Sequence, residues 1–366
     1  MPFTSAAKPT APLSVLIIAE PGIITDHISG ALAGAGDLQV LGPYELGADG
    51  ISKLRRQHVD CIVIDIGMRH ENALISLNRI LKIDEKAKVL MASTLTFTNV
   101  KKSMTGFERG AADFIQTPAD FTKQKSKASF DAALLRAVRS LAQARRGDGI
   151  RQIDTTAPLP KPPGETLTLR PFQNVKPALI AIASSTGGPQ ALFTVLERLT
   201  ADLDVPVMIT QHMPKTFTRV LASNLAGRTN KTIVEATDGE AVSPGTVYIA
   251  PGDTHMLVHA VNGRMRIKLT EDPAVNFCRP SADPMLESIA QAYGAEVCAV
   301  VLTGMGSDGK AGAKHIIDAG GQVIAQDFAT SVVWGMPGAV SKAGYCSKIL
   351  PLDKIAPLLN SLLGHK

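Results

Sequence analysis

IAIASSTGGPQALFTVLERL, residues 180–199, is the stretch that decides the fold expected for the C-terminal half of the chain. It begins as a short, continuous apolar run, which is typical of a strand buried on both faces. Two serines, a threonine and two glycines follow, and a helical pattern begins at residue 189. A buried strand that leads directly into a helix is the repeating unit of a parallel α/β sheet.

The same alternation of strand and helix continues through the rest of this half. Strand candidates lie at residues 178–183, 205–212, 246–251, 264–270, 296–304 and 321–327, and helical patterns lie at 189–199 and 308–321. Residues 245–269 alternate in polarity and contain the Asn262–Gly263 turn signal, so they predict an antiparallel hairpin meander. We therefore expect a mostly parallel, doubly wound sheet with an antiparallel hairpin insert at one edge.

The N-terminal half predicts a smaller sheet of the same α/β class. Clear strand patterns lie at residues 13–19, 59–66, 87–93 and 111–118, a weaker one at 38–44, and helical patterns at 71–83 and 130–146. Five strands with helices between them, in about 130 residues, fit a flavodoxin-like doubly wound domain. The stretch that follows is rich in proline, glycine and threonine. The expected organisation is a first domain at 12–146, a linker at 147–176 and a second domain at 177–366.

Composition narrows the class of protein and its compartment. The 366 residues are 45% hydrophobic and 19% charged, which supplies enough apolar material for two cores. The longest apolar runs are of strand length, far short of the roughly 20 residues of a membrane span, and the N-terminus shows no signal-peptide pattern. The four cysteines lie far apart and predict neither disulfides nor a zinc site. We expect a cytoplasmic protein that does not insert into membranes.

The positive charge is concentrated in one segment. Residues 123–176 contain eleven Lys or Arg and four Asp or Glu, a net charge of +7, so the rest of the chain sums to −2. A basic tract can bind nucleic acid, but aromatic side chains, only 4% of the chain, are not interleaved with this one. We interpret the segment as a solvated helix and linker and expect no nucleic-acid partner.

Polar residues follow three of the predicted strands of the second half. They are a hydroxyl cluster at 184–186, the pair Gln211–His212, and TGMGSDG at 303–309. Sites in doubly wound sheets form beyond the carboxyl ends of the strands. A hydroxyl, an imidazole and the carboxylate of Asp308 are the components of a Ser–His–Asp triad. The chain order is not that of α/β-hydrolases, and their G-x-S-x-G motif is absent.

Each of these residues also has a purely structural interpretation. A serine or threonine at 184–186 would cap the following helix, Asp308 would cap the helix after it, and His212 would be a packed core residue. The catalytic interpretation uses the positive helix N-terminus to stabilise an oxyanion, with Gly187 and Gly188 letting a carbonyl approach the backbone. Three strand ends that supply three triad groups favour catalysis. A third interpretation, a nucleotide-binding enzyme that uses Gly187 and Gly188, is weak because the sequence contains neither G-x-G-x-x-G nor a P-loop pattern there.

Six motifs in the second half resemble the catalytic domain of the chemotaxis protein-glutamate methylesterases, the CheB family. The resemblance runs from about residue 178 to residue 363. The motifs are IAIASSTGGPQAL, QHMPKTFTRVLASNLA, IAPGDTHMLV, VNFCRPSADPML, VLTGMGSDGKAGA and IAQDFATSVVWGMPGAV. The resemblance implies Ser185 as nucleophile, His212 as general base and Asp308 as the residue that orients the imidazole. It links Thr186 and Met305 to the oxyanion site or its support.

The resemblance also implies the reaction and its partners. Such enzymes hydrolyse glutamyl methyl esters on the signalling helices of methylated chemoreceptors, and many members also deamidate receptor glutamines. Their esterase domain uses neither a metal nor a cofactor. His255 and Arg279 match segments that line the pocket in the family. For both residues, substrate contact, core packing and bracing of a loop are alternative roles. An alternative is a non-catalytic signalling adaptor that retains the esterase fold.

The first half then resembles a response-regulator receiver with an altered site, which implies contact with a sensor kinase. Asp65 matches the phosphoacceptor, Glu20 one acid of the pair after the first strand, and Ser93 the hydroxyl after the fourth. Ala19 stands where the second acid is usual, and Thr117 where a lysine is usual. Mg²⁺ needs oxygen ligands, of which Glu20 and Asp65 could still supply some, and the phosphoryl group needs a cation that threonine cannot supply. These departures argue against Mg²⁺ binding and phosphorylation at Asp65.

Overall fold

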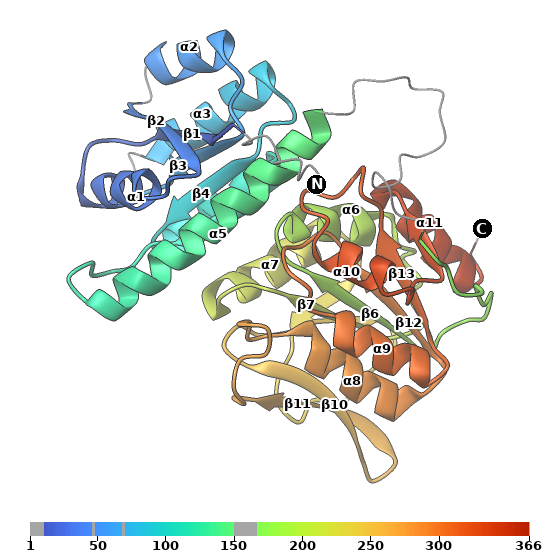
Figure 1. Cartoon of the computed structure of the whole chain (residues 1–366). Coiled ribbons are helices and arrows are strands. Elements are labelled where there is room, and N and C mark those ends of the chain that lie inside the picture. The colour runs from blue at the N-terminus through green and yellow to red at the C-terminus, as the bar shows by residue number, and fades with distance from the viewer. Residues whose placement is uncertain (1–10, 46–47, 68–69, 150–166, 366) are drawn as a thin grey trace, which may run out of the picture. The chain divides into compact units, whose positions relative to one another are not determined.

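The computed structural model of the chain describes residues 11–45, 48–67, 70–149 and 167–365 (Figure 1). These residues form two compact units. The first unit takes the described residues up to 94 and those from 113 to 149, and the second takes 95–112 and 167–365. Residues 95–112, expected in the first domain, group with the second unit because helix α4 (Phe97–Glu108) has its neighbouring elements there.

The first unit contains a five-stranded sheet in the order β2-β1-β3-β4-β5. Its strands are β1 (Leu13–Ile18), β2 (Leu38–Tyr44), β3 (Cys61–Asp65), β4 (Val89–Ser93) and β5 (Asp113–Gln116). All neighbouring pairs are parallel. This is the flavodoxin-like order, so the predicted fold class is confirmed, including the weak strand at 38–44.

Helices cover both faces of this sheet (Figure 1). They are α1 (Ile23–Ala33), α2 (Ala48–Arg56), α3 (His70–Ile83) and α5 (Gln124–Gly149). Helices α1 and α5 are neighbours, and α2 and α3 are neighbours. Because β3 and β4 are buried along their whole length, they form the centre of the core, and this explains their continuous apolar sequence.

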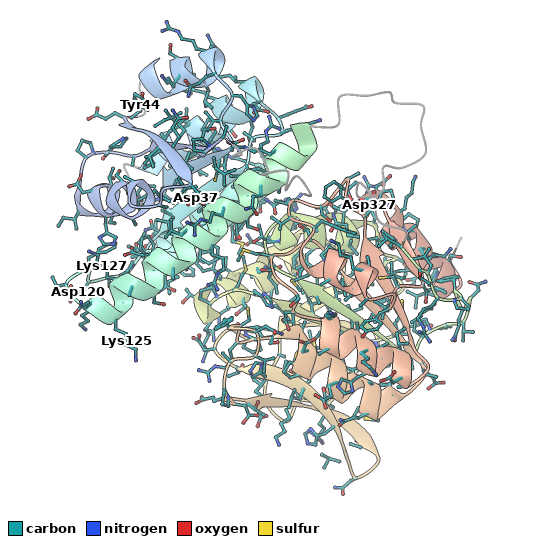
Figure 2. All side chains as sticks on the ribbon, in the orientation of Figure 1. Asp37, Tyr44, Asp120, Lys125, Lys127 and Asp327 are labelled. Carbon is teal, nitrogen blue, oxygen red and sulfur yellow. The ribbon has the colours of Figure 1, made fainter. Side chains whose placement is uncertain are left out.

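The basic segment of the sequence is partly neutralised within the first unit. Three arginines of α5 form ion pairs at 2.7–2.9 Å with aspartates of the same unit: Arg139 with Asp37, Arg145 with Asp84 and Arg146 with Asp60. Lys125 and Lys127, at the start of α5, are exposed (Figure 2). The arginine charges therefore hold α5 to the sheet and its loops.

The predicted linker at 147–176 is described only at its two ends. Helix α5 continues to Gly149, three residues past the expected domain boundary. Residues 150–166 lie outside the described part of the chain, and 167–176 form neither helix nor strand.

The second unit is built on a seven-stranded sheet in the order β14-β13-β12-β6-β7-β9-β8. Its strands are β6 (Leu179–Ser184), β7 (Val207–Gln211), β8 (Thr232–Glu235), β9 (Thr246–Ile249), β12 (Val297–Val301), β13 (Gln322–Gln326) and β14 (Lys348–Leu350). The helices are α6 (Gly188–Arg198), α7 (Lys215–Arg228), α8 (Ala282–Tyr293), α9 (Lys310–Asp318), α10 (Met336–Lys342) and α11 (Leu352–Leu362). Every neighbouring pair in this sheet is parallel, as the prediction required.

The antiparallel hairpin consists of β10 (His255–Val261) and β11 (Arg264–Thr270). Asn262 and Gly263 both have positive φ at its tip, as a tight hairpin turn requires. The hairpin forms its own two-stranded sheet, and its inner side chains pack with those of α8. The predicted meander covered residues 245–269, and it is wrong for β9, which pairs in parallel with β7. The turn at Pro251–Gly252 separates β9 from the hairpin.

The helices of both units serve to cover sheets. The longest described helix, α5, has 26 residues and carries many charged side chains. Within the described residues, no helix combines the length and apolarity needed to cross a membrane.

Candidate active site

The register of three adjacent strands brings the predicted triad residues to one edge of the second sheet. β6 lies between β7 and β12, with Ser184 opposite Gln211 and Ala183 opposite Val301. The residues that follow the ends of β6 and β7 are Ser185 and His212, and Asp308 lies in the turn between β12 and α9. The strands that follow β6 in the chain lie on both sides of it, with β7 on one side and β12 on the other. The strand order therefore reverses at β6, and sites in doubly wound sheets form at such a reversal, beyond the carboxyl ends of the strands.

His212 and Asp308 form a short, largely buried hydrogen bond. His212 Nε2 lies 2.6 Å from Asp308 Oδ2, and the two side chains are 11% and 2% exposed. Burial alone would raise the pKa of Asp308, but the bond and charge of His212, with bonds from Ser281 and Ala282, hold it well below its usual value. Asp308 is therefore an ionised partner that fixes the imidazole, as in a triad.

The N-terminus of α8 holds the Asp308 carboxylate in place. The backbone N–H groups of Ala282 and Asp283 donate to its two oxygens at 2.6 and 3.2 Å. The Ser281 hydroxyl donates at 2.6 Å, and Asn276 Nδ2 at 2.9 Å. Positive helix ends stabilise anions, so α8 supports the ionised form. The alternative that Asp308 caps its own helix is wrong, because Gly309 is the N-cap of α9, and the carboxylate that accepts a hydrogen bond from the first turn, at Gly312, is that of Asp283.

The two serines at the end of β6 lie in different environments. Ser184 is fully buried, and its hydroxyl donates to Gln211 Oε1 at 2.6 Å. The Gln211 side-chain amide in turn donates to the carbonyl of Ser185 at 3.0 Å. Ser185 itself is partly exposed. Ser184 therefore braces the turn, and Ser185 is the serine that a substrate can reach.

The turn into α6 is not capped by a hydroxyl side chain. Its N-cap is Gly187, in the left-handed conformation with φ 76°, and no side-chain capping bond is present. A Cβ on Gly187 would lie 2.5 Å from Val332, and one on Gly188 would lie 1.9 Å from Gln211. Glycine is therefore required at both positions for packing, because Val332 and Gln211 fill the space that a Cβ would need.

His212 has a second neighbour that the sequence did not single out. Its Nδ1 lies 3.4 Å from the Cys278 sulfur, so Asp308 and Cys278 engage the two ring nitrogens. In the described part of the chain, the Ser185 hydroxyl makes no hydrogen bond. Cys278, Asn276 and Ser281 all lie in VNFCRPS, a motif quoted for its resemblance, and this was the signal that could have found them.

The remaining predicted site residues fall into two groups. Thr186 is buried beside Ser185, and Met305 is partly exposed in the loop after β12. His255 is buried; its Nδ1 accepts the Ser281 N–H at 3.2 Å, and its Nε2 lies 3.2 Å from a carbonyl of the loop before VNFCRPS. Arg279 donates to two backbone carbonyls at 2.7 and 3.1 Å. His255 and Arg279 thus brace the loop that carries Asn276 and Cys278.

The predicted receiver residues lie at the carboxyl edge of the first sheet. Asp65 ends β3, is 8% exposed, and accepts the Gly67 N–H at 2.7 Å. Burial raises its pKa, and the charge of Glu20 raises it further. Ser93 is buried, and its hydroxyl donates to the adjacent backbone carbonyl. The buried Thr117 hydroxyl has no hydrogen-bond partner in the described structure.

These residues do not fit a Mg²⁺–phosphoryl site. Ala19 supplies no oxygen ligand where a second acid is usual, and Thr117 brings no positive charge to the lysine position. Among the described residues, no group of three or more His, Cys, Asp or Glu is arranged to hold a metal ion.

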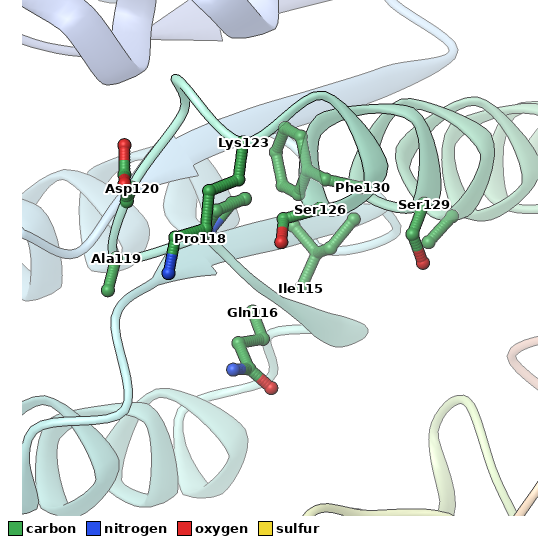
Figure 3. Close-up of a pocket in the computed structure, with 10 residues that line it drawn as sticks. Ile115, Gln116, Pro118, Ala119, Asp120, Lys123, Ser126, Ser129 and Phe130 are labelled. Atoms are coloured by element: carbon green, nitrogen blue, oxygen red, sulfur yellow. The ribbon is translucent and has the colours of Figure 1, made fainter.

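A separate groove of about 510 Å³ lies between the segment after β5 and the start of α5 (Figure 3). Gln116, Pro118, Lys123, Ser126 and Phe130 are among its lining residues. None of the predicted receiver-site residues is among the described residues that line it. The groove is therefore distinct from the phosphoacceptor position.

The geometry of the second unit defines a class of protein. It is an α/β protein that presents a serine and a largely buried histidine–aspartate pair, the constellation of the serine hydrolases, at the carboxyl edge of a parallel sheet. The chain belongs to the CheB methylesterase family, whose sequence model matches residues 180–359.

Similar proteins cover the chain from end to end. One from Paramagnetospirillum magneticum, named protein-glutamate methylesterase/protein-glutamine glutaminase 1, is 40% identical over 100% of both chains. One from Azospirillum brasilense with the corresponding name is 42% identical over 100% of this chain and 97% of its own. The crystal structure of the Thermotoga maritima CheB methylesterase catalytic domain is 42% identical, with a TM-score of 0.50, over 51% of this chain and 100% of that domain.

Proposed function

We propose that this protein hydrolyses glutamyl methyl esters on the signalling helices of chemoreceptors and deamidates receptor glutamines at the same site. The observation that carries the proposal is the 2.6 Å bond between His212 and Asp308 beside the accessible Ser185. Family membership and the names of the similar proteins support the reaction. The four cysteines are unpaired, so we assign the reaction to the reducing cytoplasm.

The proposed mechanism is acyl transfer through Ser185. Asp308 holds Nε2 of His212, so Nδ1 is the nitrogen that accepts the Ser185 proton as the hydroxyl oxygen attacks the ester carbonyl. The positive N-terminus of α6 stabilises the oxyanion, with Thr186 and Met305 beside it. His212 then protonates the departing methoxide, which leaves as methanol. Water, activated by His212, hydrolyses the acyl-enzyme to glutamate and restores Ser185.

Deamidation follows the same course with a different leaving group. The carboxamide carbon of glutamine accepts the Ser185 oxygen, and His212 protonates the departing nitrogen, which leaves as ammonia. Hydrolysis of the same glutamyl acyl-enzyme then yields glutamate. One pair of residues therefore serves both substrates.

The direct test is methanol release from methylated receptor membranes by the purified full chain. Release above a buffer control supports the esterase. If a folded protein releases none but still binds the receptor, the non-catalytic adaptor is the better description.

The pH dependence of kcat/KM is expected to show one rise whose midpoint lies above 6.5, the ordinary value for histidine. Burial disfavours the charged imidazole, but Asp308 and Cys278 more than offset this and raise the pKa of His212. The base must be neutral to accept a proton, so a raised pKa moves the active range to higher pH. The measurement is kcat/KM from about pH 5.5 to 10. A flat profile or a midpoint below 6.5 in a folded protein would count against His212.

Regulation through the receiver-like unit is expected to be weak. We propose that this unit contacts a sensor kinase but binds a phosphoryl group poorly. Small phosphodonors with Mg²⁺ should then raise methanol release by less than about twofold, against the 5–150-fold usual for allosteric coupling. A fragment that begins at Asn174 should be at least as active as the full chain. Strong activation that Asp65→Ala abolishes would overturn this expectation.

A further inference from the structure

An exposed phenylalanine stands at the tip of a tight turn next to the His212–Asp308 pair. Val275 and Cys278 exchange two backbone hydrogen bonds, of 3.1 and 2.9 Å, across this turn. The two residues between them, Asn276 and Phe277, have φ values of 53° and 63°. This is the geometry of a two-residue hairpin turn that favours Asn followed by Gly. Asn276 suits its position, whereas Phe277 occupies the place where glycine is free of strain.

The turn is fastened to the candidate active site on both sides of Phe277. Asn276 donates to Asp308 at 2.9 Å, and the Cys278 sulfur lies 3.4 Å from His212. Arg279 ties the same segment to the end of the hairpin through two backbone carbonyls. The backbone of Phe277 is thus held one residue from each contact with the catalytic pair.

The side chain of Phe277 contributes little to the folded core. It is 91% exposed, the most of any large hydrophobic side chain among the described residues. A bulky residue with positive φ is strained, and such strain gathers at ligand contacts, where the surrounding structure enforces it. Neither burial nor the turn geometry accounts for an aromatic ring at this position.

We propose that Phe277 determines specificity for the receptor, by packing against apolar side chains of the substrate helix on either side of the methyl ester. This assignment rests on the proposed function. An aromatic ring offers a large apolar surface with few rotatable bonds, which is the usual character of an anchor in protein recognition. A small ester that lacks the helix cannot make this contact. Loss of Phe277 should therefore weaken turnover of the receptor and leave the chemistry at Ser185 on a small ester unaffected.

The experiment compares methylated receptor membranes with the γ-methyl ester of N-acetylglutamate as substrates of the full-length Phe277→Gly variant. The ratio of kcat/KM for receptor to kcat/KM for the small ester is expected to fall roughly tenfold, mainly through a higher KM for receptor. The melting temperature should stay equal or rise, because glycine adopts positive φ without strain. Phe277→Tyr should restore the ratio.

Val175→Ala is the matched control. Val175 is 62% exposed and precedes the start of β6, at the opposite end of that strand from Ser185, so its loss should leave the ratio unchanged. An unchanged ratio in Phe277→Gly, or an equal fall in Val175→Ala, would overturn the assignment. If the wild-type chain releases methanol from the small ester but not from receptor membranes, the proposed receptor substrate fails as well. If the wild-type chain does act on receptor membranes and only the result for Phe277→Gly differs from the expectation, the role of Phe277 is overturned and the proposed function stands.

Discussion

Replacing Ser185 with alanine is expected to lower kcat/KM for methanol release by about 10⁴-fold or more, the usual loss when a triad nucleophile is removed. The reason is its position: Ser185 is the accessible hydroxyl at the end of β6, beside His212 at the end of β7. The measurement is turnover of methylated receptor membranes. Thermal unfolding of the variant should match that of the wild type.

Ser184→Ala is the neighbouring control and should retain a substantial fraction of activity. Its hydroxyl is buried and bonded to Gln211, so its loss leaves a buried acceptor unpaired. That change typically lowers the free energy of unfolding by about 1–3 kcal/mol, and a reduced melting temperature would reveal it. Activity that collapses in Ser184→Ala and survives in Ser185→Ala would reverse the assignment.

Cys278→Ser is the second control, because the Cys278 sulfur contacts Nδ1 of His212, the ring nitrogen that is not bonded to Asp308. A thiol beside an imidazole can itself act as a nucleophile. With Ser185 as nucleophile, Cys278→Ser keeps substantial turnover, and iodoacetamide treatment of the Ser185→Ala variant changes nothing. Loss of turnover in Cys278→Ser, together with its survival in Ser185→Ala, would assign the acyl-enzyme to the thiol.

Replacing Asp308 with asparagine is expected to lower kcat by about 10³–10⁴-fold while the protein stays folded. Asparagine keeps the shape of the side chain but loses the charge that stabilises the imidazolium and selects its tautomer. Since Asp308 raises the pKa of His212, the midpoint of the pH profile should also move to lower pH in the variant. Both readouts come from steady-state kinetics across the pH range.

Asp283→Asn is the matched control for this variant. Asp283 stands in the first turn of α8 and accepts hydrogen bonds from Gly312 and Asn276, but it does not touch His212. Burial and the charge of Asp308 raise the pKa of Asp283, so neutralising it removes a like charge near Asp308. Its kcat should stay within about tenfold of the wild type, well short of the loss on removing a triad member. Equal losses in the two folded variants would mean that loss of either charge in this cluster lowers turnover, and that Asp308 has no specific role as a triad member.

The strands that carry the site were predictable because their signals are local. β6, β7 and β12 are buried along their whole length, so each appears in the sequence as an apolar run followed by polar residues. β8 and β14 were not predicted, since they are edge strands of four and three residues that are only partly buried. A pattern so short cannot be told from a loop.

The sequence by itself determined the α/β class, the central strands, and a hydroxyl, His212 and Asp308 beyond three strand ends, because strand and helix patterns arise between residues close along the chain. The choice of Ser185 among the hydroxyls at 184–186 came from the resemblance to the CheB family. The tertiary structure alone decided which other groups contact His212 and Asp308. Asp308 is held by α8, not by its own helix, and Cys278 faces His212 across 66 positions of sequence. Such contacts depend on how separate elements pack in space. The periodicity of one segment shows which of its own faces is buried, but it does not show which residues of another element will lie against that face.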